Sequence, residues 1–428
     1  MKNVVPSGNP YAGNPHVRFE EEEVASTKPR RGSLRYKDVG WLGKSLAAFL
    51  CIASIHSLFG AWYDSPVVKA QVDVGYAGNY AYYINQSEDG RYLMVNTQSG
   101  NDNFPVQLYA TADLNGAVGA ASGLALGEAF GKDLFGTGGN GWKGGAISAK
   151  LGVMIPGSGA PASGSAVYTA LEVPATRWTK NVSAFAVSGL GATSIDGMDF
   201  NPSGTKLYCN NKDPQNKILA YPVTDGHTFG TPAEFTVAAA TRIRNLSVYS
   251  IGGKELVYFG EGNVGSGAKA VYVLDPATGL ATALVTDATR FASNIMNVKL
   301  SGADTSAPKL YVQTESSGLF VYELAADGKS VLSATPVAEF TAAQVAAFCG
   351  SSVTCSVASF EVSPDGRFAY FLGLSQPGFA SPSLTVISDA MIAFSAKSYF
   401  VDTRQPIVAL SDSSELDTNP SGLLIFIR

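Results

Sequence analysis

The segment Phe360-Glu-Val-Ser-Pro-Asp-Gly-Arg-Phe-Ala-Tyr-Phe371 carries the clearest signal for the fold of this chain. Two apolar runs flank a Pro-Asp-Gly turn. Pro presets the first dihedral angle of such a turn, and Gly takes the positive φ that other residues resist. Apolar and polar residues alternate before the turn, which is the pattern of a half-buried strand. The stretch therefore predicts an antiparallel β-hairpin.

Related hairpins recur along the chain. Looser copies span 87–95, 198–208, 246–259, 298–312 and 419–427. A second recurring piece is a strand that ends in an Asp/Gly turn, as in Val271-Tyr-Val-Leu-Asp-Pro-Ala-Thr-Gly279. Two short strand units that alternate at a regular spacing are typical of a repeat architecture.

The spacing of the hairpin turns predicts the number of repeats. The turns fall at Gly90, Gly204, Gly253, about Asp304, Gly366 and Gly422, so the gaps are 114, 49, 51, 62 and 56 residues. The long gap holds two periods of 57, which places a degenerate unit near residue 147. Seven units of four strands each predict an all-β fold, a single seven-bladed β-propeller of antiparallel strands over residues 64–428.

The two ends of this repeat region are expected to meet in one blade. The chain ends on the second strand of the seventh unit, so the outer strands of that unit must come from elsewhere. Val67–Val74 is the simplest source. Such a closure would remove an exposed sheet edge. Deletion of residues 62–76 is therefore expected to destabilise the whole domain.

The segment before the repeats has a different composition. Residues 1–40 are polar, with several prolines and an acidic run, and predict a disordered tail. Residues 41–63 are apolar and follow a basic flank, which is typical of a signal peptide or a signal-anchor helix. Cleavage after Val68-Lys69-Ala70 would free Gln71. Cleaved or not, this interpretation places the repeats in a secreted, periplasmic or cell-surface location. A buried helix in a cytosolic protein is the alternative.

Composition restricts the partners. Charged residues make up 15% of the chain and the net charge is -5. No basic run interleaved with aromatic residues follows residue 62, which argues against nucleic acid. We expect a monomer whose partner is a protein or a carbohydrate.

Cys349 and Cys355 predict a small disulfide loop, with two buried thiols as the alternative. Cys209 is expected to be a small core residue.

The Ser363-Pro-Asp-Gly-Arg367 hairpin and the Val271–Gly279 strand resemble the repeats of YVTN and lactonase-like propellers. The resemblance covers about residues 77–428 and implies the propeller fold. Lactonase-like activity implies His, Arg and Glu at the central face. The repeat region holds one histidine, His227, at a predicted hairpin tip, which argues against that activity.

A carboxylate site remains as a candidate. Asp196, Asp199 and Glu361 lie near the starts of predicted inner strands, where propellers bind Ca²⁺ through side-chain oxygens. The alternative is that these residues cap turns or meet solvent, and no cofactor is then expected.

The Gly-rich run 136–145 lacks the Gly-Lys-Ser/Thr ending of a phosphate loop. Trp142 in that run is a candidate contact for a partner or a sugar.

Three classes of function remain open. The first is a non-catalytic binding or scaffold module. The second is a lactonase-like or calcium-dependent hydrolase that uses carboxylates at the central channel. The third is a structural component of an envelope or a surface layer. The sequence favours the first class and identifies no ligand.

Overall fold

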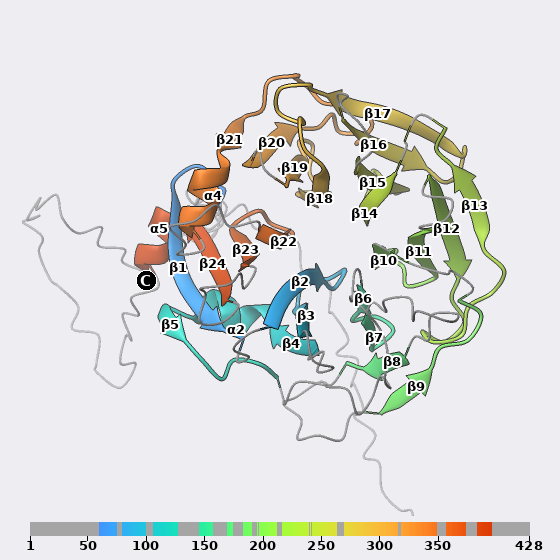
Figure 1. Cartoon of the computed structure of the whole chain (residues 1–428), viewed down its shortest axis with the longest axis horizontal. Coiled ribbons are helices and arrows are strands. Elements are labelled where there is room, and N and C mark those ends of the chain that lie inside the picture. The colour runs from blue at the N-terminus through green and yellow to red at the C-terminus, as the bar shows by residue number, and fades with distance from the viewer. Residues whose placement is uncertain are drawn as a thin grey trace, which may run out of the picture. The chain divides into compact units, whose positions relative to one another are not determined.

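The computed structural model describes residues 60–74, 79–99, 106–126, 145–156, 169–173, 183–190, 195, 197–211, 216–238, 240, 242–262, 269–315, 318–348, 357–373 and 383–395. These residues form six β-sheets arranged as the blades of a propeller (Figure 1). The blades are β2–β4, β6–β9, β10–β13, β14–β17, β18–β21, and β22–β24 with β1 and β5, and are numbered 1 to 6 in that order.

The strands have these bounds. Blade 1 holds β2 (Asn79–Gln86), β3 (Tyr92–Ser99) and β4 (Val106–Ala110); blade 2 holds β6 (Gly145–Ser148), β7 (Val153–Pro156), β8 (Thr169–Glu172) and β9 (Ala184–Ala186). Blade 3 holds β10 (Met198–Phe200), β11 (Lys206–Asn211), β12 (Lys217–Pro222) and β13 (Ala233–Thr236). Blade 4 holds β14 (Ile243–Ile251), β15 (Lys254–Glu261), β16 (Ala270–Asp275) and β17 (Leu280–Thr286). Blade 5 holds β18 (Ile295–Ser301), β19 (Lys309–Thr314), β20 (Gly318–Glu323) and β21 (Ala338–Phe340). Blade 6 holds β22 (Val357–Val362), β23 (Phe368–Gly373), β24 (Ser383–Asp389), β1 (Pro66–Asp73) and β5 (Gly119–Ala121).

The prediction of a propeller is confirmed, but the predicted count of seven blades is wrong. The inner strands contact one another in the cyclic order β2, β6, β10, β14, β18, β22, and β22 contacts β2 directly. The ring therefore closes with six blades, and no space remains for a seventh. The degenerate unit expected near residue 147 is present as β6 and β7. The seventh unit was inferred from residues 419–427, which lie outside the described residues.

The ring closes as expected, because an N-terminal strand joins the last sheet. That sheet is blade 6, whereas a seventh blade was expected. Strand β1 pairs antiparallel with β24 from Pro66, opposite Asp389, to Asp73, opposite Ser383. Its other edge pairs in parallel with β5. The predicted closing strand is thus confirmed, and it completes the sixth sheet. The cleavage site proposed after Ala70 lies inside β1, so cleavage there would cut the closing strand in two.

A second contact fastens blade 6 to blade 1. The Lys69 side chain is buried, and its Nζ donates a hydrogen bond to the backbone oxygen of Ala117 at 2.9 Å. Tyr370 of β23 donates from its hydroxyl to Asn115 Oδ1 at 2.7 Å. Asn115 belongs to helix α2 (Thr111–Gly116), which follows β4. Closure therefore includes side-chain hydrogen bonds as well as strand pairing.

The position of Trp62 shows that the predicted apolar helix extends too far toward the propeller. It lies in a turn before β1, and its side chain is completely buried. The indole stacks on Phe340 with ring centroids 5.5 Å apart and meets Phe371 edge-on at 5.9 Å. The end of the predicted 41–63 helix therefore belongs to the propeller core. Residues 41–59 lie outside the described part of the chain, and no helix within the described part is long and apolar enough to cross a membrane.

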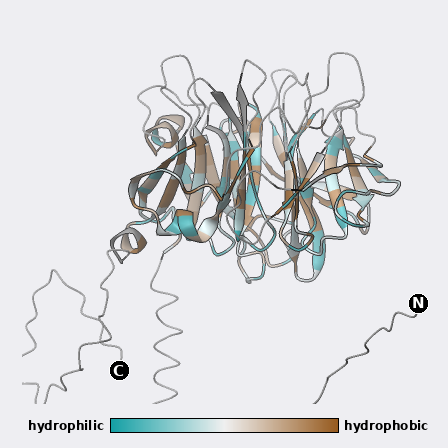
Figure 2. Cartoon of the chain, turned by 90° about the horizontal axis from the view of Figure 1, so that it is seen from below, coloured by the Kyte–Doolittle hydropathy of each residue, from teal (hydrophilic) through white to brown (hydrophobic). Residues whose placement is uncertain are grey.

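Apolar side chains fill the spaces between blades. Figure 2 shows hydrophobic stretches along the strands. Between blades 4 and 5, for example, Tyr258 and Val273 pack with Leu310 and Val312. Burying each large apolar side chain contributes roughly 1.5–3 kcal/mol. Cys209 is a completely buried free thiol in such a layer, which confirms it as a core residue.

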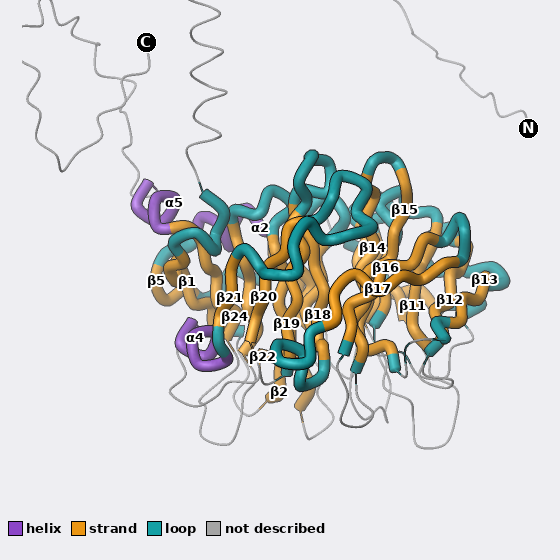
Figure 3. Tube along the Cα trace, turned by 90° about the horizontal axis from the view of Figure 1, so that it is seen from above, coloured by secondary structure: helices purple, strands orange, loops and turns teal. Residues whose placement is uncertain are grey.

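The turns between the first and second strands of the blades lie on one face of the ring, which we call the hairpin face. In blade 6, Gly366 has a φ of 71°, and Ser363 accepts a hydrogen bond from the N–H of Phe368 at 3.0 Å. Helices α2 and α5 (Ala390–Ser395) lie at this face, and α4 (Ala342–Phe348) lies at the opposite face (Figure 3). The Gly366 carbonyl accepts the backbone N–H of Trp62, so the described chain also enters the propeller here.

Candidate functional site

One position recurs near the end of each inner strand. In four blades it lies two residues before the Ser or Asn that begins the hairpin turn, at Asn85, Asp199, Lys299 and Glu361. The same alignment places Ala146 in blade 2 and Tyr249 in blade 4. Side chains on a strand alternate between its two faces, so equal register gives equal direction. The repeat therefore sets one side chain per blade at a common level around the central axis.

These side chains contact the inner strand of the next blade. Asn85 donates from Nδ2 to the backbone oxygen of Gly145 at 2.8 Å. Asp199 Oδ2 accepts the N–H of Val248 at 2.9 Å. The Tyr249 hydroxyl accepts the N–H of Leu300 at 3.0 Å. Each contact satisfies a polar group at the inner edge of a sheet and joins two blades.

Lys299 and Glu361 form the same kind of link as an ion pair between blades 5 and 6. Both residues are nearly completely buried, with 1% and 3% of their surface exposed. Burial raises the pKa of Glu361, and the neighbouring Lys299 opposes that shift. Lys299 Nζ also lies 6.0 Å from the centroid of the Tyr83 ring. Because isolated charges are costly inside a protein, each member of this pair depends on the other.

A second polar layer lies deeper in the channel, further from the hairpin face. The Tyr83 hydroxyl donates to Asn245 Oδ1 at 2.9 Å, and Asn245 Nδ2 donates to Asn297 Oδ1 at 2.5 Å. Asn297 Nδ2 in turn donates to Gln313 Oε1 at 2.6 Å. Tyr83, Asn245, Asn297 and Gln313 come from three blades, so this chain of hydrogen bonds ties the ring together beneath the first level.

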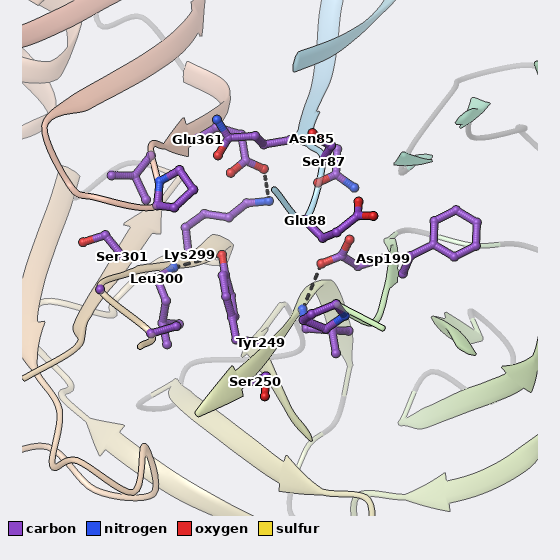
Figure 4. Close-up of a pocket in the computed structure, with 18 of the residues that line it drawn as sticks. Asn85, Ser87, Glu88, Asp199, Tyr249, Ser250, Lys299, Leu300, Ser301 and Glu361 are labelled. Atoms are coloured by element: carbon purple, nitrogen blue, oxygen red, sulfur yellow. Dashed lines mark hydrogen bonds and ion pairs between the residues drawn. The ribbon is translucent and has the colours of Figure 1, made fainter. Parts of the chain in front are cut away.

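Above this layer a cavity of about 280 Å³ opens among the inner-strand hairpins (Figure 4). Asp199, Tyr249, Lys299 and Glu361 line it. Its lining also includes apolar residues, of which Pro202, Ala303 and Pro364 are at least partly exposed. Segments of five blades meet here, so the pocket depends on the closed ring.

Asp199 is a second carboxyl in the pocket wall whose pKa is raised. Burial raises its pKa to about 7, and Lys299 together with the Val248 N–H limits the rise. Glu361 and Glu88 raise this pKa further. The carboxyl can therefore gain or lose a proton near neutral pH.

Glu88 supplies a further carboxylate at the mouth of the pocket. It accepts hydrogen bonds from the Ser148 hydroxyl at 3.0 Å and from the N–H groups of Ala149 and Lys150 at 3.0 and 2.7 Å. Ser148 ends β6, and Ala149 and Lys150 follow it in the β6–β7 turn, so Glu88 links blades 1 and 2. All three donors are neutral groups.

The predicted metal site is assembled only in part. Asp199 and Glu361 line the same pocket, near the hairpin ends of their strands rather than the starts, while Asp196 lies outside the described residues. Within the described residues, no group of three His, Cys, Asp or Glu side chains could hold a metal ion. The ammonium of Lys299 already bonds to Glu361. Trp142, Cys349 and Cys355 also lie outside the described residues.

Sequence reasoning missed Lys299, Tyr249 and Glu88. A usable signal was present, because Lys299 occupies the same repeat position as Asp199 and Glu361. His227 lies in a turn after β12, as expected, and stacks on Phe185 with ring centroids 4.7 Å apart. It does not line the pocket.

Comparison with known proteins identifies no family for this chain. No family model matches the chain, and no curated protein matches its sequence. Similar solved structures include hydrazine synthase of Kuenenia stuttgartiensis, with 14% identity, a TM-score of 0.42, and coverage of 74% of this chain and 97% of that chain. The Dos1 propeller is 9% identical, with a TM-score of 0.39 and coverage of 73% and 71%. A 6-phosphogluconolactonase-like protein from Bacteroides uniformis is 13% identical, with a TM-score of 0.41 and coverage of 73% and 83%.

The propeller assignment therefore rests on the six sheets and their cyclic contacts. The narrower resemblance to YVTN and lactonase-like repeats stays a prediction, because no family model supports it.

Proposed function

We propose that this protein is a non-catalytic binding module whose ligand site is the pocket at the hairpin face. The main support is how the polar side chains of the pocket are used. Asp199 and Tyr249 bond to backbone N–H groups of the next blade, and Lys299 bonds to Glu361. These contacts hold the walls in place around a cavity that is partly apolar. A preformed cavity with a few fixed polar groups is the usual form of a small-molecule site.

The arrangement gives less support to covalent catalysis. A serine or cysteine nucleophile needs a base within hydrogen-bond reach, and that base is most often histidine. His227 is the only histidine among the described residues, and it does not line the pocket. The buried thiol of Cys209 has a raised pKa because of its burial, which makes it a poor nucleophile.

A blocking substitution tests the binding site. Ser250 is exposed and lines the pocket, so Ser250→Trp should fill the mouth without disturbing the core. Ser333→Trp, at an exposed position between β20 and β21, is the matched control. A library of small polar molecules is screened by thermal shift against the wild type and both variants. We expect at least one ligand to stabilise the wild type and Ser333→Trp but not Ser250→Trp. No ligand with this pattern would contradict the proposal.

We also propose that the module works outside the cytoplasm. The support is the apolar composition of residues 41–63 behind a basic flank. Fractionation of a tagged full-length protein, followed by N-terminal sequencing, tests this location. Recovery of the full-length protein in the cytosol would contradict it.

A hydrolase is the second candidate, and one observation favours it. The carboxyl of Asp199 has a pKa of about 7, which suits a general base at neutral pH. A panel of lactones, assayed with and without Ca²⁺, tests this alternative. Turnover that Asp199→Asn abolishes would favour the hydrolase over the binding module.

A further inference from the structure

We infer that the pocket at the hairpin face binds a small ligand that carries a positively charged amine. This inference rests on the proposed binding function and names the chemical class of its ligand. Three features of the pocket support it: the balance of charge in its walls, the partners of those charges, and its size.

The charge balance favours a cation. Four carboxyl groups line the pocket, from Glu88, Asp199, Asp304 and Glu361, and one ammonium group, from Lys299. With every group ionised, the lining carries four negative charges and one positive charge, a net charge of -3. An anionic ligand would meet repulsion from most of this lining. A cationic ligand would be attracted, more strongly than in bulk water because the walls are partly apolar.

The contacts within the pocket leave carboxylate charge that can attract a cationic ligand. Lys299 is bonded to Glu361 and also attracts Asp199, so a single ammonium group serves two of the four carboxyls. The hydrogen-bond donors to Asp199 and Glu88 are neutral groups: the Val248 N–H in one case, and Ser148 with the β6–β7 turn in the other. A ligand ammonium near Asp199 would compensate a carboxylate that burial has deprived of water. The aromatic hydroxyl of Tyr249, beside Asp199 in the wall, offers a further polar contact (Figure 4).

The size of the pocket restricts the ligand. A volume of about 280 Å³ lies just below the range of roughly 300–1,000 Å³ typical of drug-sized sites. Pro202, Ala303 and Pro364 are apolar residues of the lining that are at least partly exposed. The ligand we infer therefore has a short carbon skeleton and at least one ammonium group.

A charge series with one carbon skeleton tests this inference. The probes are 1,4-diaminobutane, 1,4-butanediol and succinate, which carry positive, zero and negative charge on four carbons. Titration calorimetry with the full-length protein measures their affinities. We expect the diamine to bind at least about tenfold more tightly than either of the other probes, which is a difference of about 1.4 kcal/mol.

Three variants locate the effect. Asp199→Asn should weaken diamine binding by about tenfold or more, and Asp304→Asn, at the exposed rim, should weaken it by a smaller factor. Asp113→Asn removes one exposed carboxylate from α2, away from the pocket, and should leave the affinity unchanged. If Asp199→Asn folds poorly, Asp304→Asn still tests the inference, because Asp304 is exposed and its replacement should not disturb folding.

The outcomes separate the inference from the proposed function. Preferential binding of succinate or butanediol that Ser250→Trp abolishes would overturn the inference and keep the binding module. Diamine binding that Asp199→Asn and Asp304→Asn leave unchanged would also overturn it. So would a failure of all three probes to bind, and the library screen then decides separately whether the pocket binds anything.

Discussion

Replacement of Trp62 by alanine tests whether the segment before β1 is part of the propeller. The indole is completely buried and stacks on Phe340 and Tyr311, with ring centroids 5.5 and 6.1 Å apart. Truncating a buried tryptophan to alanine typically costs about 3–5 kcal/mol. We expect the upper half of this range, because Trp62 also anchors the turn that leads into β1, whose seven registered pairs with β24 close the ring.

Urea unfolding followed by circular dichroism measures this cost. Leu280→Ala is the matched control, because Leu280 is 67% exposed on β17 and its truncation removes little buried surface. Trp62→Ala should lower the urea midpoint of unfolding well below that of Leu280→Ala. The slope of the free energy of unfolding against urea concentration should be similar in the two variants. Deletion of residues 62–76, which removes Trp62 and all of β1, should be more severe still. A free energy of unfolding for Trp62→Ala within about 1 kcal/mol of that of the control would refute the proposed role of this segment.

Three further predictions concern the central channel. Lys299→Met leaves Glu361 buried without its partner and should cost about 3–5 kcal/mol in urea unfolding, whereas Lys299→Met combined with Glu361→Leu should cost much less; equal costs would contradict a coupled pair. Tyr249→Phe leaves the Leu300 N–H without its acceptor and should cost about 1–3 kcal/mol, measured in the same way; an unchanged midpoint would show that water replaces the hydroxyl. The raised pKa of Asp199 means that the folded state holds this proton more tightly than the unfolded chain, so the contribution of Asp199 to stability is lost as pH rises from about 4 through about 7. The melting temperature of Asp199→Asn relative to wild type should therefore rise between pH 5 and pH 8; a constant difference would contradict the raised pKa.

The local structure could be predicted because its causes are local. The hairpin at Gly366 follows from a Pro-Asp-Gly turn between alternating strands. The degenerate unit that holds β6 and β7 was found from the regular spacing of such turns. The closing strand β1 could be predicted as well, since a sheet edge in a ring needs a partner.

The blade number could not be predicted in the same way. Counting turns assigns a blade to every hairpin-like segment, including residues 419–427. The number of blades depends on whether β22 packs directly against β2, which is a tertiary contact. Trp62 was misassigned for a related reason, because an apolar residue counts equally toward a membrane helix and a protein core in a hydropathy average.

The pocket was predicted in part. Asp199 and Glu361 were found because they lie near predicted inner strands at the central channel, where carboxylate oxygens bind Ca²⁺ in propellers. Lys299 was missed because lysine in a strand is normally assigned to the surface. Only the shared register of the repeats shows that Lys299 must lie at the same level as the two carboxyls, and only the folded ring shows that it bonds to Glu361.

Proton release on ligand binding tests the central claim that the pocket is a cation-binding site built around Asp199. With a pKa of about 7, this carboxyl is about half protonated at pH 7. A bound ammonium group stabilises the carboxylate, so binding should release up to about half a proton per site, while the amine itself stays charged. Titration calorimetry with 1,4-diaminobutane at pH 7, in two buffers of different ionisation enthalpy, measures that number. We predict release of protons by the wild type and by Asp113→Asn, and none by Asp199→Asn. Binding to the wild type without proton release would contradict a cation site at Asp199.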